Sequence, residues 1–210
     1  MNVWGIVLAA GAARRFGSAK QFATLGGRSL VDRVVLTAGS ACDAVVVVLP
    51  HTVRWGGPTV AAAVPGGSTR AASVRCALRA VPPTAEIIVV HDAAHPLATR
   101  ALFDSVIAGV AGGAEATIPA LRPSEPIKRV RDDRVLETIP RDELMIIQTP
   151  HAFRAEALRA VHSKGDEAIE DSAMVERMGG TITVVRGDPR NLHVTSPIEL
   201  EMASQLLGSE

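Results

Sequence analysis

The chain has 210 residues, of which 47% are hydrophobic, and its 22 Lys and Arg residues are matched by 22 Asp and Glu residues. This length predicts one domain, residues 1–210, large enough to bury its own core. A formal net charge of zero argues against broad electrostatic binding to nucleic acid or an anionic membrane, and 3% aromatic residues leave little material for stacking on bases.

Apolar, β-branched runs alternate with segments of helical period along the chain. Strands are predicted, in chain order, over 3–9, 44–49, 86–91, 114–120, 145–148 and 181–186, and helices over 29–40, 70–80, 99–110, 154–164, 171–178 and 197–207. Buried strands that alternate with helices predict an α/β fold, a Rossmann-like, mostly parallel sheet flanked by helices. In the first helix we expect Leu30, Val34 and either Leu36 or Thr37 to face the core.

Polar or glycine-rich loops follow Ala9, Pro65 and His91, and the first and third of these residues end expected strands. Ligands of open α/β sheets bind outside the carboxyl ends of the strands. We therefore expect these three loops to meet at one edge of the sheet and to build a single site.

The first of these loops, from Leu8 to Lys20, combines small residues with Arg14, Arg15 and the closing lysine. Small residues let backbone N–H groups approach phosphates closely, and the cations add fixed positive charge. The loop has neither the G-x-G-x-x-G spacing nor a Gly-Lys-Ser/Thr ending. It therefore predicts a site for a nucleoside triphosphate that differs from both common phosphate signatures.

Residues 122–143 break the alternation because they are charged and contain three prolines. Within them, 127–130 and 134–139 are expected to form a hairpin around Asp132-Asp133. Such a segment is either a protruding β-arm that reaches a neighbouring subunit, which would make the protein a homodimer, or a solvated surface loop. The pattern alone leaves both interpretations open.

The two cysteines, Cys42 and Cys76, lack the spacing of a metal site and are typical of reduced thiols. The apolar runs are far shorter than the roughly 20 residues of a membrane span. The N-terminus enters an apolar run without the charged region of a signal peptide. We expect a cytoplasmic protein that binds neither membrane nor nucleic acid.

Six motifs extend over nearly the whole chain: the loop ending in Lys20-Gln21-Phe22, then 66–74, 90–94, 148–150 with Phe153, 170–176, and 191–195. Their residues and order resemble the 2-C-methyl-D-erythritol 4-phosphate cytidylyltransferase family. The resemblance implies that an oxygen of the acceptor phosphate attacks the α-phosphorus of CTP and that pyrophosphate leaves. Such a reaction needs alignment of two anions and neutralisation of charge more than it needs a general base.

The resemblance also implies which residues bind CTP. They lie in the first loop and around the start of the second helix, at Ala9, Ala10, Gly11, Ala12, Arg15, Lys20, Gly66, Gly67, Arg70 and Ser73. The two cations of the first loop are implied to stabilise the transition state, and the later residues to bind cytosine and ribose. The alternatives are solvated loop charges in the first case, and helix capping and a surface charge in the second.

Asp92 follows a buried strand and is expected at the carboxyl edge of the sheet. A carboxylate there suits Mg²⁺, which binds carboxylate and phosphate oxygens together; its alternative is a turn-capping residue. The resemblance implies that Asp92 is catalytic with Arg15 and Lys20. It further implies an acceptor site made of Asp92, His95, Arg141, Thr149 and His193, with the arginine supplied by a partner subunit. Asp171 and Glu176 match a motif that favours a structural role.

Several residues depart from the family pattern. His95 and His193 stand where the family usually has Arg and Lys, and Glu125-Pro126 replaces an Asp-Thr pair. Lys20 follows Arg15 by five positions, a shorter spacing that is similar to the molybdenum-cofactor nucleotidyltransferases. Fewer fixed cations should weaken binding of an anionic acceptor. Two alternatives to methylerythritol phosphate transfer therefore remain, a cytidylyltransferase for another polyol phosphate such as ribitol 5-phosphate, and a catalytically silent nucleotide-binding paralogue.

Overall fold

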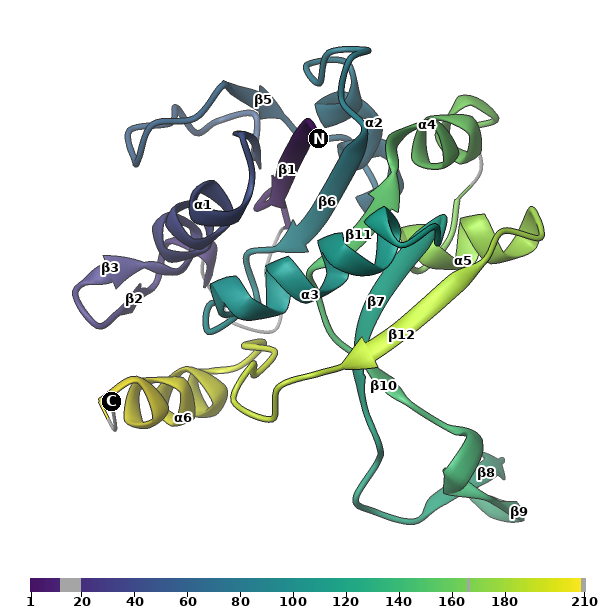
Figure 1. Ribbon diagram of the computed structural model, residues 1–210. Helices are drawn as coiled ribbons and strands as arrows, with labels where there is room; N and C mark the ends of the chain where they lie inside the picture. The colour runs from purple at the N-terminus through teal and green to yellow at the C-terminus, as the bar shows by residue number, and fades with distance from the viewer. Residues whose placement is uncertain (12–19, 166, 209–210) are drawn as a thin grey trace.

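The computed structural model describes residues 1–11, 20–165 and 167–208. Its main sheet has the strand order β10-β7-β11-β6-β1-β4-β5, with β12 paired to β7 (Figure 1). β5, β4, β1, β6, β7 and β12 run in one direction, whereas β10 and β11 run against their neighbours. The strands are β1 (Val3–Leu8), β4 (Ala44–Leu49), β5 (Ala62–Pro65), β6 (Ile87–Asp92), β7 (Ala116–Leu121), β10 (Ile146–Ile147), β11 (His151–Arg154) and β12 (Ile182–Arg186).

Helices cover both faces of this sheet, so the predicted mostly parallel α/β fold is confirmed. One core lies under α1 (Leu30–Ala41) and α3 (Arg100–Ala111), and the other under α2 (Arg70–Leu78), α4 (Ala155–Ser163) and α5 (Asp171–Arg177). The central strands β1, β4 and β6 are buried on both faces, which explains their nearly continuous apolar sequences.

Helix α1 begins at the N-cap Ser29, whose side chain accepts a hydrogen bond from the Asp32 N–H at 3.1 Å. Leu30 and Val34 are buried as expected. Of the two alternatives at the next turn, Leu36 is 41% exposed, so that option is wrong, whereas Thr37 is half-buried. The helix packs against both the sheet and α3, and its buried face therefore runs through Val31 and Val35 rather than through Leu36.

Strand β11 was not expected from the sequence. Its four residues pair antiparallel with β6 on one side, and Ala152 and Phe153 also pair antiparallel with β7 on the other. The first three residues are buried. The segment is short, follows Pro150 and begins with a polar histidine. Its sequence therefore lacks a clear strand pattern and resembles a loop before the next helix. This strand inserts Thr149 and His151 next to the end of β6, and it therefore shapes the site.

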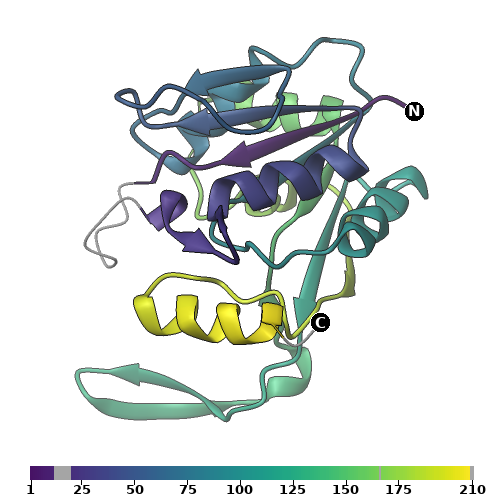
Figure 2. The ribbon, with the colours of Figure 1, turned by 90° about the vertical axis from the view of Figure 1, so that its left-hand side faces the viewer.

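The hairpin expected within residues 122–143 is confirmed. Strands β8 (Ile127–Arg131) and β9 (Arg134–Ile139) pair antiparallel, and Asp132 and Asp133 have φ values of 46° and 61° at the turn. Two successive positive φ values match the twist of a tight hairpin. Most arm side chains are exposed, and the arm extends away from the sheet beneath the C-terminal helix α6 (Pro197–Gly208) (Figure 2).

Helix α6 closes the chain over a small third core. Buried Leu25 and Leu30 meet Val194 and Ala203 there, next to the two-residue strands β2 (Thr24–Leu25) and β3 (Arg28–Ser29). The segment before α6 is thereby held close to Lys20 at the start of the short helix η1 (Lys20–Phe22). Among the described residues, no helix is long and apolar enough to cross a membrane.

Candidate active site

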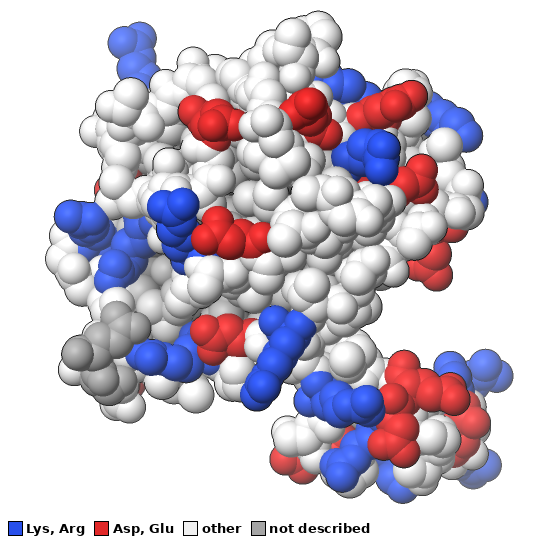
Figure 3. Space-filling view, in the orientation of Figure 1, with Lys and Arg blue, Asp and Glu red and all other residues white. Residues whose placement is uncertain are grey.

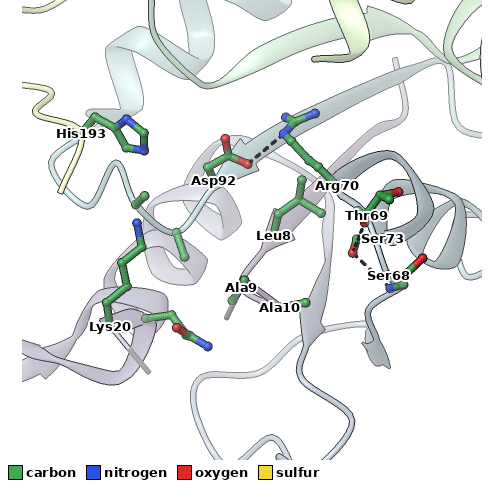
Figure 4. Close-up of a pocket in the computed structure, with 15 residues that line it drawn as sticks. Leu8, Ala9, Ala10, Lys20, Ser68, Thr69, Arg70, Ser73, Asp92 and His193 are labelled. Carbon is green, nitrogen blue, oxygen red and sulfur yellow. Dashed lines mark hydrogen bonds and ion pairs between the residues drawn. The ribbon is translucent and has the colours of Figure 1, made fainter. Parts of the chain in front are cut away.

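A pocket of about 480 Å³ opens at the carboxyl ends of β1 and β6, where the sequence predicted a single site (Figure 4). Its described lining comes from the end of β1 with the start of η1, the start of α2, the end of β6, and the segment before α6. Its described lining residues are Leu8, Ala9, Ala10, Gly11, Lys20, Gln21, Gly67, Ser68, Thr69, Arg70, Ser73, Asp92, Ala93, Ala94 and His193. The structure thus brings most of the expected CTP-binding residues to one place. Gly66 is buried outside the lining, and Ala12 and Arg15 lie outside the described residues.

Lys20 is held at one side of this pocket. Its Nζ donates a hydrogen bond to the Val194 carbonyl oxygen at 3.0 Å, which links the first loop to the segment before α6. The neighbouring Gln21 is only 4% exposed and also lines the pocket, but its Nε2 has no hydrogen-bond acceptor within the described part of the chain. A buried amide without a partner costs free energy. The Lys20-Gln21-Phe22 motif was the available signal, yet it assigned no role to the glutamine.

Close packing explains the two glycines before α2. A Cβ at Gly66 would lie 2.3 Å from the Ala10 Cβ, and one at Gly67 would lie 2.4 Å from the Ala72 Cβ. The Gly67 N–H donates to Ser73 Oγ at 3.1 Å, and that hydroxyl donates to the Thr69 carbonyl at 2.9 Å. Ser73 is buried, lines the pocket and holds the loop, but it does not cap α2, because the N-cap of that helix is Thr69.

Arg70 joins the start of α2 to the end of β6. Its Nε lies 3.5 Å from Asp92 Oδ1 (Figure 4). Its Nη1 donates to Asp171 Oδ2 on α5. Burial alone would lower the pKa of this guanidinium, but the two carboxylates outweigh burial and raise the pKa above its ordinary value. Arg70 is therefore neither the cap of α2, which is Thr69, nor a solvated surface charge.

Asp171 is 1% exposed, and its other oxygen, Oδ1, lies 2.8 Å from His162 Nε2. Burial alone would raise the pKa of this carboxyl, but the hydrogen bond with His162 and the charge of Arg70 lower it to about 2. An ionised carboxylate therefore lies directly behind the pocket. The expectation that Asp171 organises structure is consistent with this position.

The donor set at Asp92 fits a magnesium ion that arrives with a nucleotide. Asp92 lies at the end of β6, lines the pocket, and has a side chain 28% exposed. No group of three or more His, Cys, Asp or Glu residues in the described ranges could hold a metal by itself. Mg²⁺ commonly takes one or two carboxylates and completes its shell with phosphate oxygens and water. One pocket carboxylate suits that mode of binding.

Two of the expected acceptor residues, His95 and Thr149, form a hydrogen-bonded group with His91 beside Asp92. Thr149 Oγ1 lies 2.8 Å from His91 Nδ1 and 3.1 Å from His95 Nδ1, and it accepts from the Asp92 N–H at 3.2 Å. His91 Nε2 faces the His95 carbonyl at 3.2 Å and so must carry its proton. The Thr149 hydroxyl then donates to His91 Nδ1 and accepts from His95 Nδ1.

This group is neutral near pH 7. Burial lowers the pKa of His91 to about 4 and that of His95 to about 2. The His95 ring is only 6% exposed and stacks on His193 with centroids 4.6 Å apart. His193 reaches the pocket itself, whereas His95 and Thr149 are buried outside its lining. His95 therefore adds no positive charge where the family pattern has an arginine.

Arg141 lies apart from the pocket lining, in the short helix η2 (Arg141–Glu143) at the base of the arm. It is exposed, and its Nη1 donates to the Ser124 carbonyl at 2.6 Å. The arm carries basic and acidic side chains intermixed (Figure 3). Within one chain, Arg141 and the pocket are not brought together, and its role in acceptor binding stays a prediction.

A family model described as "IspD: 2-C-methyl-D-erythritol 4-phosphate cytidylyltransferase" matches residues 3–209. A protein of that name from Frankia casuarinae is 38% identical over 99% of this chain and 82% of its own length. A "Bifunctional enzyme IspD/IspF" from Solidesulfovibrio magneticus is 34% identical over 95% of this chain, which spans 56% of that longer protein. The crystal structure of the cytidylyltransferase from Thermus thermophilus is similar with a TM-score of 0.86 and 29% identity over 98% of both chains.

Proposed function

The chain belongs to the 2-C-methyl-D-erythritol 4-phosphate cytidylyltransferase family, and we propose on that basis that its pocket transfers CMP from CTP to 2-C-methyl-D-erythritol 4-phosphate. Pyrophosphate is the second product, and the step belongs to isoprenoid precursor biosynthesis. The observation that carries this proposal is the meeting of Lys20, Arg70 and Asp92 at one edge of the sheet in a chain matched over residues 3–209.

Different residues of the pocket bind different parts of CTP. The Gly66-Gly67 loop and the start of α2 hold the base and ribose, because the absence of a side chain lets the backbone come close. Lys20 neutralises charge on the triphosphate as the two anions meet. The acceptor phosphate is already a nucleophile at neutral pH, so the neutral histidines beside Asp92 are not required as bases.

Magnesium is proposed as the cofactor, held by Asp92 together with the phosphates of CTP. When bound, Mg²⁺ neutralises triphosphate charge and favours departure of pyrophosphate. Asp92 has a second task, because its carboxylate orients Arg70 across the pocket. The protein supplies the direction of approach, and the metal supplies charge that the described pocket residues lack.

We propose a cytoplasmic homodimer in which the arm of one subunit brings Arg141 to the acceptor site of the other. The support is the arm itself: it extends from the body, and Arg141 lies at its base away from the pocket of its own chain. A guanidinium suits a bidentate contact with a phosphate. The arm would thereby complete an acceptor site in which His95 is neutral.

A different polyol phosphate is the second candidate acceptor, favoured by one observation. The stacked rings of His95 and His193 occupy the place of two fixed cations, and His95 is buried and neutral. An acceptor held there by hydroxyl contacts would suit these rings better than one held by its phosphate. Ribitol 5-phosphate is the alternative acceptor. A catalytically silent nucleotide-binding paralogue is the alternative to an enzyme.

The test is pyrophosphate release from CTP and Mg²⁺, with methylerythritol phosphate and ribitol 5-phosphate offered in parallel and the products identified by mass. Release with methylerythritol phosphate and a CDP-linked product supports the proposal. Release with ribitol 5-phosphate alone moves the assignment to the second acceptor. Binding of CTP without release for either acceptor would identify the silent paralogue.

A further inference from the structure

Arg70 forms an ion pair with a buried carboxylate, Asp171, which does not line the pocket. Its Nη1 donates to Asp171 Oδ2, and the Asp171 side chain is 1% exposed while that of Arg70 is 26% exposed. His162 on α4 fixes the other oxygen of Asp171 at 2.8 Å. We propose that Asp171 is a positioning residue, which sets the Arg70 guanidinium for contact with an oxygen of the nucleotide. This inference rests on the proposed function.

The network connects four elements that are far apart in the sequence. Arg70 begins α2, Asp171 begins α5, His162 lies in α4, and Asp92 ends β6. Burying a carboxylate costs several kcal/mol in principle, and apolar residues of the same volume pack as well or better. A buried ion pair directly behind a pocket is therefore weak as a stabilising device. It is effective as a clamp, because it fixes the orientation of a planar group.

The donors of Arg70 show which part of the side chain is left for a ligand. A guanidinium has five N–H groups in a fixed plane. Asp171 takes a donor from Nη1, and Asp92 lies beside Nε. No hydrogen bond within the described part of the chain uses Nη2, although Arg70 lines the pocket. Because carboxylates lie against Nη1 and Nε, the guanidinium plane has a fixed orientation, and Nη2 is left for a ligand.

Asp171 therefore controls a pocket group without touching the ligand. A neutral side chain at this position would leave Arg70 with Asp92 as its remaining carboxylate partner. The guanidinium would then turn toward β6, and the contact with the nucleotide would weaken. Because the effect passes through Arg70, it should vanish when Arg70 is replaced.

The experiment is a double-mutant cycle read by calorimetric titration of CTP with Mg²⁺ and no acceptor. We expect D171N to weaken CTP binding about tenfold or more, the scale for one charge-assisted hydrogen bond. R70Q should weaken it similarly, and R70Q/D171N should be no weaker than R70Q within about threefold, because two residues that act as one unit are not additive. Additive losses, or unchanged binding in D171N, would overturn the inference.

A matched control uses the other arginine pair of α2. Arg75 Nη2 lies 2.6 Å from Glu167 Oε1, but Glu167 is exposed and neither residue lines the pocket. E167Q should bind CTP as the wild type does. Should R70Q fail to fold because it leaves the Asp171 charge buried, D171N is compared with R70Q/D171N. A further tenfold loss in that double variant would refute positioning through Arg70.

The outcomes separate this inference from the proposed function. If the wild type binds CTP but yields no CDP-linked product, the transferase proposal fails while the cycle still decides the role of Asp171. If product forms normally and the cycle is additive, the transferase proposal stands and Asp171 has a structural role alone.

Discussion

Replacing Gly67 by alanine tests whether close packing before α2 shapes the nucleotide pocket. A Cβ at this position would lie 2.4 Å from the Ala72 Cβ and 2.8 Å from the Ala72 carbonyl carbon. Non-bonded carbon atoms prefer about 3.5–4.0 Å, so the loop or the first turn of α2 must move by about 1 Å. Neither neighbour is a flexible side chain that could swing away. The displaced loop would also strain the hydrogen bond from the Gly67 N–H to Ser73.

The expected magnitude follows from these contacts. Overpacking of this kind costs about 1–3 kcal/mol. For a chain of this length that cost lowers Tm by about 2–12 °C. A shift of about 1 Å in a binding loop can cost up to about a hundredfold in rate. We therefore expect kcat/KM for CTP to fall about ten- to a hundredfold in the Gly67→Ala variant, measured by pyrophosphate release on protein shown to be folded.

Gly39 provides the control, because the same substitution should have the opposite sign there. It is exposed in α1, and a Cβ would meet nothing within 4 Å. Alanine in a helix is more stable than glycine by about 0.5–1 kcal/mol, so Gly39→Ala should raise Tm slightly and leave turnover unchanged. A Gly67→Ala enzyme with the Tm and kcat/KM of the wild type would refute the packing argument.

Lys20→Ala should lower turnover by about a hundredfold or more in a steady-state pyrophosphate assay, since it removes a preorganised cation from the pocket; near-normal turnover would exclude Lys20 from the mechanism. Burial lowers the pKa of His91 to about 4 and of His95 to about 2. The unfolded chain therefore binds more protons below about pH 6.5, and the free energy of unfolding should fall from there toward about pH 4, as urea denaturation at about pH 7.5 and about pH 5 would measure. Removal of residues 127–139 should give a monomer by sedimentation velocity and weaken acceptor binding more than CTP binding. A dimer with unchanged acceptor KM would contradict the role of the arm.

The main sheet could be predicted because its central strands satisfy simple rules. β1, β4 and β6 are buried on both faces and therefore consist of continuous apolar runs. β11 could not be predicted, because four residues with a polar start carry too little periodicity. Its place between β6 and β7 depends on pairing with strands that are distant in the sequence. The arm lies between these cases, since its two runs and the central Asp132-Asp133 turn signal a hairpin without indicating where it points.

The site shows the same division between local and long-range information. Gly67 and Asp92 lie at the carboxyl edge of the sheet as predicted, because each lies at or just beyond the end of a strand. The link from Asp171 to Arg70 joins residues 101 positions apart, so no local pattern could reveal it. The neutrality of His95 likewise follows from its burial and from its neighbours, which are properties of the folded chain.

The charges of the pocket indicate what the acceptor site still needs. Among the described lining residues, the cations are Lys20 and Arg70, and Arg70 lies between Asp92 and Asp171. Two carboxylates thus offset much of the positive charge that faces a triphosphate and an acceptor phosphate. A transition state that brings two such anions together needs more cationic charge than this. The additional charge has three proposed sources, a magnesium ion at Asp92, the arginines of the first loop, and Arg141 from a second subunit. Catalysis in this chain should therefore depend more strongly on metal and on assembly than in relatives with an arginine and a lysine at positions 95 and 193.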